Sequence, residues 1–427
     1  MTLVFQGGQV VREGAAKLEV ADVVVVDGAI TQVRPGAEVP EGARVIGCAG
    51  KVVLPGMFDA HVHFRDPGRE DTETIRSGSE AAIGGGVTGV LMMPNTSPAI
   101  DSGGIVQSVL DNARDNSRLR HVYTAGCITK GRAGEALASI AGMAGRGVRV
   151  LTDDGTPVSS PLVLRRAMEY ARNFELIVAS HCESLELSGD GAINEGRVSY
   201  ALGLTGIPAC SEEIGLDRDI RLAQYTGARL HIQHLSTARG VEAIRRAKDE
   251  GVQVSCEVSP HHLIFNEGHI LDFDTNFKTS PPLRMPEDND ALVKGLIEGV
   301  IDLIATDHAP HSEFEKRQDF ASAPFGITGL ETALPALYHH FVKAGTFGWP
   351  LVLERFAAAP RRLLGLAPMG IREGQAAAEI VVFNPGRKSV FTKAAMRSKS
   401  ANTPWLDAEL EGMVETVVAN GQILLER

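Results

Sequence analysis

Two histidines, His61 and His63, stand two positions apart in residues 57–64, a strand-like run that follows the turn pair Pro55-Gly56. Side chains two apart in a strand share a face, so both imidazoles project to the same side. Two imidazoles on one face make half of a metal site. Either histidine alone could equally be a hydrogen-bonded core residue. Whether they are metal ligands therefore depends on which other residues of the chain lie near them.

The elements that must position this pair are short apolar runs that alternate with helical stretches, such as residues 241–248 and 291–297. Together with the first run, the strand-like runs are residues 57–64, 87–93, 119–125, 148–151, 176–180, 228–233, 252–258 and 303–305. Eight such runs predict an α/β fold, a (β/α)₈ TIM-type barrel over residues 55–365. An open doubly wound sheet is the alternative, but no GxGxxG or Walker sequence supports it.

The two ends of the chain have a different sequence pattern, in which strand-like runs are separated by short turns. Residues 18–26 and 29–33 flank Asp27-Gly28, a strong hairpin signal because a type I′ turn needs positive φ. Near the other end, residues 415–419 and 422–425 flank Asn420-Gly421 in the same way. Neither end alone is long enough for a stable sheet. We therefore predict that residues 1–54 and 366–427 form one small composite β-sandwich domain.

In such barrels the chemistry lies on the loops that follow the strands, at the carboxyl ends. Five of the eight predicted strands end in an imidazole or a carboxylate: His61 and His63, Asp153-Asp154, His181, His234, and Asp307. Nitrogen and oxygen donors of this kind suit a divalent ion such as Zn²⁺. The sequence therefore predicts a metal site at this end of the barrel.

The stretches around these residues resemble a known family. Asp-Ala-His-Val-His-Phe-Arg-Asp-Pro at 59–67 and Ala-Thr-Asp-His-Ala-Pro-His-Ser-Glu-Phe-Glu-Lys at 305–316 are similar to the two signatures of the dihydroorotases of the amidohydrolase superfamily. Residues 93–96, 152–155, 259–263, 278–284 and 323–327 also resemble that family's type I bacterial branch. The resemblance covers essentially the whole chain. It implies reversible, zinc-dependent cyclisation of N-carbamoyl-L-aspartate to L-dihydroorotate in pyrimidine (UMP) biosynthesis.

The resemblance also implies a role for each ligand. His61, His63 and Asp307 would hold one zinc, and His181 and His234 a second where it is present. A strand-four carboxylate would bridge the two ions, where many amidohydrolases have a carboxylated lysine. Family spacing favours Asp154 for this place, with Asp153 as the alternative. One or two zincs are both consistent with the sequence.

The expected reaction uses a metal-bound hydroxide, since bound Zn²⁺ brings the pKa of water to about 7. Asp307 would take its proton and pass it to the leaving nitrogen. A substrate carboxylate suits the planar fork of Arg65, although an ion pair with Asp66 or Glu70 is the simpler alternative. The other substrate contacts that the resemblance implies are His63, Asn95, Ser280, His311, Phe325 and Gly326. Ser280 stands where the family pattern leads us to expect Asn.

Composition limits the other functions. The formal net charge of -11 argues against broad binding to nucleic acid or anionic membranes. The N-terminus lacks a signal-peptide pattern and no apolar run is long enough to span a bilayer, so we expect a cytoplasmic protein. The five cysteines are scattered and form no CxxC pair, which indicates buried thiols rather than disulfides. The resemblance allows a homo-oligomer or an aspartate transcarbamoylase partner.

Two rival functions and one open structural question remain. A hydantoinase or allantoinase is the nearest other cyclic amidase, and a non-catalytic subunit that scaffolds aspartate transcarbamoylase is a rival of another class. Hydantoinases and allantoinases usually use the bridging lysine, and non-catalytic subunits have typically lost ligands that this chain keeps.

The polar residues 311–320 after Asp307 could be a lid that orders over substrate or a static solvated loop.

Overall fold

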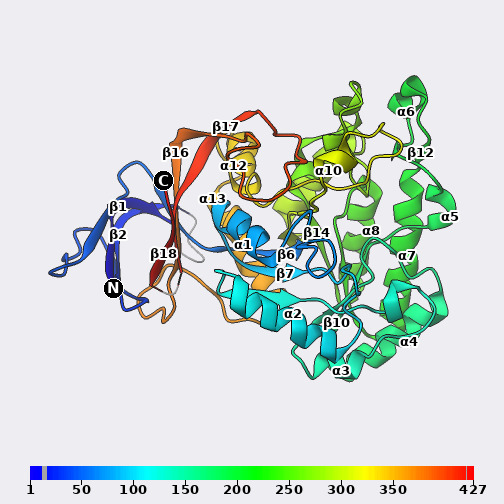
Figure 1. Cartoon of the computed structure of the whole chain (residues 1–427), viewed down its shortest axis with the longest axis horizontal. Helices are drawn as coiled ribbons and strands as arrows, with labels where there is room; N and C mark the ends of the chain where they lie inside the picture. The colour runs from blue at the N-terminus through cyan, green and yellow to red at the C-terminus, as the bar shows by residue number, and fades with distance from the viewer. Residues whose placement is uncertain (12–16, 420) are drawn as a thin grey trace.

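The computed structural model describes residues 1–11, 17–419 and 421–427. A helix-wrapped barrel lies on one side of the molecule and a β-sheet built from both chain ends on the other (Figure 1). Of the residues described, none belongs to a helix that is long and apolar enough to cross a membrane.

The barrel is a closed ring of parallel strands. In ring order these are β6 (Met57–Val62), β7 (Val87–Met92), β8 (His121–Thr124), β9 (Val150–Leu151), β10 (Ile177–Ser180), β13 (Arg229–Ile232), β14 (Val254–Val258) and β15 (Leu303–Ile304). Isolated parallel bridges close the two gaps, Gly126 to Leu151 and Val62 to His308. Each strand lies within the run that the sequence predicts, so the barrel and its strand positions are confirmed.

Helices pack around this ring, one or more after each strand. Between consecutive strands lie α1 (Ile75–Gly84), α2 (Gly103–Asn116), α3 (Ile140–Ala144), α4 (Pro161–Arg172), α7 (Ala209–Thr226), α8 (Ala238–Asp249) and α10 (Pro286–Glu298). After β15 come α12 (Ala333–Leu337), α13 (Trp349–Leu353) and α14 (Ala359–Leu363). Apolar faces on these helices and the outward sides of the strands form one continuous core.

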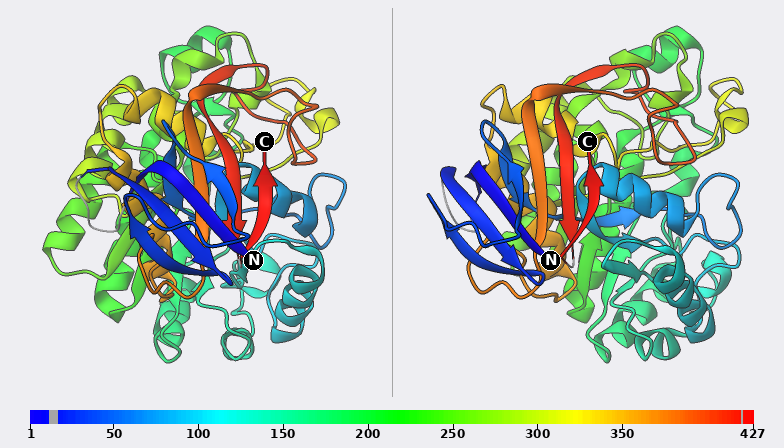
Figure 2. Two further views of the ribbon diagram at one scale, coloured as in Figure 1. Left: turned by 90° about the vertical axis from the view of Figure 1, so that its left-hand side faces the viewer. Right: turned by 60° about the vertical axis from the view of Figure 1, so that its left-hand side comes forward.

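Strands from both chain ends share one sheet. Its order is β18 (Gln422–Glu426), β17 (Glu409–Ala419), β16 (Glu379–Val390), β5 (Val52–Pro55), β1 (Thr2–Val10), β2 (Glu19–Val26) and β3 (Ala29–Arg34), with β4 (Arg44–Gly47) paired to β1. The strands from the two ends lie side by side in Figure 2.

The β2–β3 hairpin turns at Asp27 and Gly28, whose φ angles of 48° and 81° match the predicted type I′ turn. Asn420, the first residue of the other predicted turn, lies outside the described residues. The composite sandwich and the domain boundaries at residues 54 and 366 stay predictions, since the pairing shows one shared sheet rather than two packed layers.

A short junction joins the sheet to the barrel. Gly56 separates β5 from β6, and a Cβ there would lie 2.1 Å from Oγ1 of Thr88, so only glycine fits without displacement. The buried carboxylate of Glu379 at the start of β16 accepts hydrogen bonds from Thr88 and Arg361, each at 2.5 Å. This buried ion pair fixes the barrel end that lies opposite the strands' carboxyl ends.

The connection between β16 and β17, residues 391–408, returns over the barrel. Ser398 donates to Glu73, and the backbone N–H groups of Arg397 and Ser398 donate to Glu331. Asn402 accepts from the His311 N–H at 3.0 Å. A segment that we assign by sequence to the β domain therefore supports loops at the carboxyl end of the barrel.

Candidate metal centre and substrate cavity

Six buried side chains converge at the carboxyl ends of five barrel strands. They are His61 and His63 from β6 and the residue just after it, Asp154 after β9, His181 after β10, His234 after β13, and Asp307 after β15. All six are the residues singled out from the sequence. Parallel strands deliver their carboxyl ends to one rim, which brings residues 246 positions apart in the chain into contact.

One group consists of His61, His63 and Asp307. The Asp307 Oδ1 lies 3.0 Å from Nε2 of His63 and 3.4 Å from Nε2 of His61. The ligand atoms of all three lie within 4.8 Å of one another. Two imidazole nitrogens and one carboxylate oxygen at this spacing can hold one divalent ion.

A second group forms around Asp154. Its Oδ1 lies 3.5 Å from Nε2 of both His61 and His234, and 3.7 Å from Nδ1 of His181. Its Oδ2 lies 3.4 Å from Nε2 of His63. The carboxylate therefore stands between the two pairs of imidazoles, where it can bridge two ions. His181 and His234 also touch directly, with Nδ1 and Nε2 2.8 Å apart.

The neighbouring Asp153 faces the other way. Its carboxylate accepts hydrogen bonds from the backbone N–H groups of Ile128 and Thr129 and from the Thr129 hydroxyl. These bonds tie the loop after β8 to the loop after β9. Of the two adjacent aspartates, the geometry therefore directs Asp154 toward the histidines and uses Asp153 in the scaffold.

A further observation indicates that these side chains suit a metal ion. Nε2 of His61 and Oδ1 of Asp154 are fully buried polar atoms with no hydrogen-bond partner among the described residues, and they face each other. An unsatisfied buried polar atom destabilises a fold by roughly 1–3 kcal/mol, so such atoms normally have a partner. A divalent ion held by these side chains would supply that partner.

The electrostatics favour positive charge at this place. Burial alone would raise the pKa of Asp154 and of Asp307, but nearby imidazoles outweigh it and hold both carboxyls well below their usual range. Burial would lower the pKa of His181, yet Asp154 and Glu183 raise it to about 10. The acids stay ionised, and a cation, either a protonated imidazole or a metal, is stabilised beside them.

Glu257 in β14 is a residue that sequence reasoning missed. Its Oε1 lies 2.5 Å from Nδ1 of His61, and its Oε2 lies 3.1 Å from Nε2 of His231. The bond to Nδ1 fixes the His61 tautomer and leaves Nε2 directed at the metal centre. The available signal was a carboxylate inside the otherwise apolar run 252–258, because a buried charge needs a partner.

A cavity of about 480 Å³ opens from the metal centre. Every predicted substrate-contact residue lines it, namely His63, Arg65, Asn95, Ser280, His311, Phe325 and Gly326. Arg132 and Glu183 also line it and were not predicted. Glu183 lies 3.4 Å from Nε2 of His181, and Arg132 donates to the Asp154 carbonyl. Both therefore support ligand-bearing loops.

Arg65 reaches the cavity by a route that the sequence did not indicate. The strand β6 ends at Val62, and Arg65 lies beyond it with a left-handed φ of 58°. Its Nε donates to the Pro310 carbonyl at 3.3 Å. Burial lowers its pKa to about 10, so it is still cationic at neutral pH. Asp66 instead accepts hydrogen bonds from Ile75 and Asn112, and Glu70 accepts one from Gly68, so among the described residues neither carboxylate pairs with Arg65.

Two neighbours organise this side of the cavity. Oδ1 of Asn95 lies 2.8 Å from Nδ1 of His63, so Asn95 orients that imidazole as well as facing the cavity. Nε2 of His311 lies 2.8 Å from the Phe325 carbonyl, which requires a proton on Nε2. Burial and the charge of Arg65 lower the pKa of His311 to about 3, so it is neutral.

The backbone of Gly326 is already engaged. Its N–H donates to the Lys278 carbonyl at 2.9 Å, and its carbonyl accepts from Lys316 and Asn402. A Cβ at this position would lie 2.8 Å from the Ala309 carbonyl oxygen, so glycine is required here. A ring contact through Gly326 would have to share these bonds. The Phe325 N–H, in contrast, has no partner among the described residues.

Known proteins are similar to this chain over its full length, and a family model matches part of it. A family model described as "Dihydro-orotase-like" matches residues 50–240. The dihydroorotase of Pelotomaculum thermopropionicum is 43% identical over 427 residues, covering 100% of this chain and 99% of that protein. The dihydroorotase of Caldanaerobacter subterraneus subsp. tengcongensis is 42% identical over 427 residues, covering 100% of this chain and 98% of its own.

Solved structures show the same fold. The L-hydantoinase (dihydropyrimidinase) of Arthrobacter aurescens has a TM-score of 0.88 at 22% identity, covering 99% of this chain and 96% of that one. The D-hydantoinase (dihydropyrimidinase) of a Thermus species has a TM-score of 0.82 at 23% identity, covering 99% and 95%. At this identity the likeness concerns the barrel and its attached sheet.

Proposed function

The chain belongs to the dihydroorotase family, and on that premise we propose which of its residues perform the reaction. It is a cyclic amidohydrolase of pyrimidine biosynthesis that interconverts N-carbamoyl-L-aspartate and L-dihydroorotate. The observation that carries the residue assignment is the convergence of six buried imidazoles and carboxylates, two of which, His61 and Asp154, turn unpartnered polar atoms toward each other.

The metal ligands in this proposal are His61, His63 and Asp307 for one ion and His181 and His234 for a second. Asp154 would contribute to holding both, as its two oxygens face both pairs of histidines. We propose zinc as the metal, because a small number of imidazole nitrogens and carboxylate oxygens is the typical ligand set of a catalytic zinc ion. One or two ions per chain are both compatible with the donor set.

A bound divalent ion lowers the pKa of a water molecule and polarises the amide carbonyl. Asp307 supplies the proton transfer. Its carboxylate is ionised and lies at the cavity wall, 3.0 Å from His63, so it can accept a proton from the attacking water and return it to the ring nitrogen as the amide bond breaks. In the synthetic direction the same carboxylate removes the proton from the ureido nitrogen.

The substrate's carboxylate, which takes no part in the reaction, is held by Arg65, with Asn95 and His311 beside it. The guanidinium lines the cavity and stays cationic, and its planar fork suits a carboxylate. His63, Ser280, Phe325 and Gly326 complete the contacts in this proposal. Among the backbone groups of the last two, the Phe325 N–H is the donor left free to bind the ring.

Two rivals receive less support from the same site. A hydantoinase or allantoinase usually uses a bridging lysine, and here Asp154 occupies the bridging position. A scaffolding subunit without activity has no need of a complete ligand set, whereas all six side chains converge here. We retain residues 55–365 as the barrel domain, and residues 1–54 with 366–427 as the β domain. Self-association, a transcarbamoylase partner and a cytoplasmic location stay predictions.

Metal reconstitution tests this assignment. Protein stripped with a chelator should lose dihydroorotase activity, and Zn²⁺ titration should restore it at one or two ions per chain. The Asp154→Ala variant should bind fewer ions. Full activity in stripped protein with no measurable metal would contradict the proposal.

A further inference from the structure

Two buried lysines hold the loop that carries Phe325 and Gly326. Lys278 is 2% exposed and its ammonium donates to the carbonyls of Phe320 and Ala321 at 2.7 and 2.8 Å. Lys316 is 7% exposed and donates to the carbonyls of Pro324 and Gly326 at 3.0 and 3.1 Å. Four carbonyls of one short loop are thus bound by two ammonium groups.

Burying two ammonium groups without carboxylate partners costs folding free energy, so we expect this arrangement to serve a function. In the described part of the chain, both ammonium groups donate to backbone carbonyls rather than to carboxylates. Burial lowers the pKa of Lys278 to about 8, and burial together with Lys278 lowers that of Lys316 to about 7. Charged groups are normally buried only with a countercharge. Here carbonyl dipoles and an aromatic ring take that role, with the Lys278 nitrogen 4.5 Å from the Phe325 ring centroid.

The loop that they hold forms one wall of the substrate cavity. The Phe325 carbonyl accepts from His311, and the Gly326 N–H donates to the backbone of Lys278 itself. Lys278 therefore binds the loop at three places: through its carbonyl, its ammonium and its contact with the ring. The result is a fixed direction for the unpartnered Phe325 N–H.

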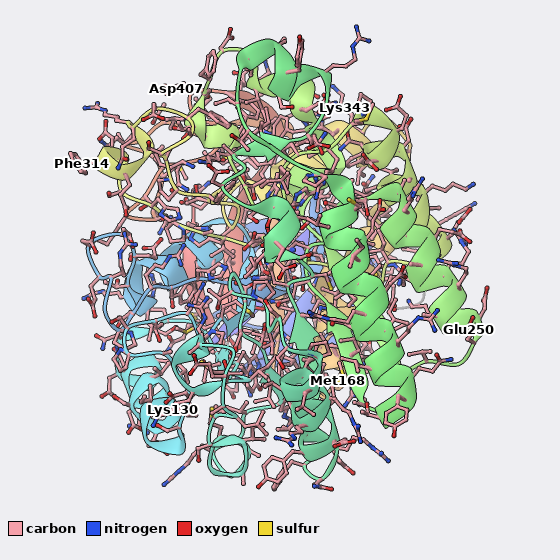
Figure 3. All side chains as sticks on the ribbon, turned by 90° about the vertical axis from the view of Figure 1, so that its right-hand side faces the viewer. Lys130, Met168, Glu250, Phe314, Lys343 and Asp407 are labelled. Carbon is pink, nitrogen blue, oxygen red and sulfur yellow. The ribbon has the colours of Figure 1, made fainter. Side chains whose placement is uncertain are left out.

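The second lysine ties a neighbouring helix to the same loop. Lys316 ends α11 (Glu313–Lys316), within the polar segment that we considered as a lid. Its side chain points inward, whereas Phe314 of the same turn is 82% exposed and projects from the surface (Figure 3). Arg69 pairs with Glu315 at 2.6 Å, which anchors the helix from its other side. The segment and the loop are joined as one unit.

We propose that Lys278 and Lys316 are positioning residues for substrate binding: together they hold the loop 320–326 so that Phe325 and His311 face the substrate. The inference rests on the proposed function for the identity of the substrate. It assigns the two lysines no contact with substrate or metal. Their effect acts through the loop, so it concerns KM more than kcat.

The test uses Lys278→Met, Lys316→Met and the double variant of the full chain, with Lys399→Met as matched control. Lys399 also donates to a backbone carbonyl, but that of Glu70 rather than one of the carbonyls of residues 320–326 that Lys278 and Lys316 bind. Each single variant should raise KM about five- to tenfold, as loss of a hydrogen-bonded support does, with kcat within about threefold and metal content unchanged. The control should leave KM unchanged.

Two further readouts separate positioning from general loss of stability. Amide hydrogen exchange should quicken at residues 320–326 in the variants and nowhere else at the rim. Because both lysines act on one loop, the double variant should raise KM less than the product of the two single effects. Unchanged KM with unchanged exchange overturns the proposal, as does a KM change that follows lost metal.

Misfolding of a variant and a wrong substrate assignment can each be told apart from failure of the proposal. If a methionine variant does not fold, Lys316→Gln, which is shorter and uncharged, takes its place; unchanged KM and exchange in that variant also overturn the proposal. Wild-type protein that hydrolyses hydantoin but not dihydroorotate defeats the proposed function alone. The same KM comparison with hydantoin then tests the lysines.

Discussion

Oε1 of Glu257 lies 2.5 Å from Nδ1 of His61, and the opposite nitrogen of that imidazole is buried, unpartnered and directed at Asp154. The carboxylate thereby sets which nitrogen of His61 can bind a metal. The same Glu257 also contacts His231, so its own position is fixed by a second ring. Ligand geometry at the rim thus depends on a residue of β14 that itself binds no metal in our assignment.

Replacing Glu257 by Gln should weaken metal binding by about 10- to 100-fold, the usual effect of removing a carboxylate that orients a metal-binding histidine. The measurement is competition for Zn²⁺ against a chelator of known affinity. His231→Gln serves as control because it alters only the outer contact of Glu257 and should have a smaller effect. Equal metal affinity in Glu257→Gln and wild type would show that His61 needs no such support.

Substitutions of the two adjacent aspartates, Asp153 and Asp154, should have different effects. Asp154→Ala removes the carboxylate that we propose as the bridging ligand, so the bound metal should fall by at least one ion per chain. Asp153→Ala should keep its metal but lose about 1–3 kcal/mol of unfolding free energy, because the buried N–H groups of Ile128 and Thr129 lose their acceptor. Metal analysis and denaturant unfolding of both variants check this. The reverse pattern would mean that Asp153 is the ligand.

Arg65→Ala should raise KM for carbamoyl-aspartate about 10- to 100-fold, the effect of losing a charge-assisted contact, while metal content stays the same. Arg65→Lys keeps the charge but not the planar fork and should recover only part of the affinity. Steady-state kinetics with parallel metal analysis measures both. Loss of metal from Arg65→Ala would place the residue in the metal centre instead.

Lys316 should make stability depend on pH. Its folded-state pKa of about 7 lies below the ordinary 10.5, so between these values the unfolded chain binds more protons. Stability therefore rises with pH in this window, by up to about 1.4 kcal/mol per pH unit. Lys278 adds to the effect of burial by lowering the pKa of Lys316 further, whereas Asp274 and Glu315 oppose it.

Denaturant unfolding of wild type and Lys316→Met at pH 7, 8 and 9 checks this dependence. The difference between the two proteins isolates Lys316, since other groups titrate in both. Wild type should gain stability relative to the variant as pH rises. A constant difference would show that burial does not lower the pKa of Lys316 in the folded protein.

The fold was largely accessible from the sequence because each barrel strand is a run of buried apolar residues bounded by turn signals. The runs that end in His61, His181 and Asp307 appear as strands within a few residues of the predicted limits. The parallel order then follows from the alternation with helices, and it brings the ligands to one rim. The convergence of these side chains could be inferred for that reason, whereas the role proposed for each of them as a ligand came from the family resemblance.

Side-chain directions at the rim could not be inferred in the same way. Arg65 enters the cavity through a left-handed backbone, and strand alternation predicts nothing beyond Val62, where the strand ends. Asn402 lies 91 residues from His311, in a loop with no motif of its own. Such contacts depend on how a distant segment returns to the barrel, which local sequence does not encode.

The most direct test of the whole account is turnover by metal-replete protein, with dihydroorotate, carbamoyl-aspartate, hydantoin and allantoin assayed side by side. We predict interconversion of dihydroorotate and carbamoyl-aspartate in both directions, abolished by chelation and restored by Zn²⁺. Absence of turnover in both directions, with hydantoin or allantoin hydrolysed instead, would contradict it.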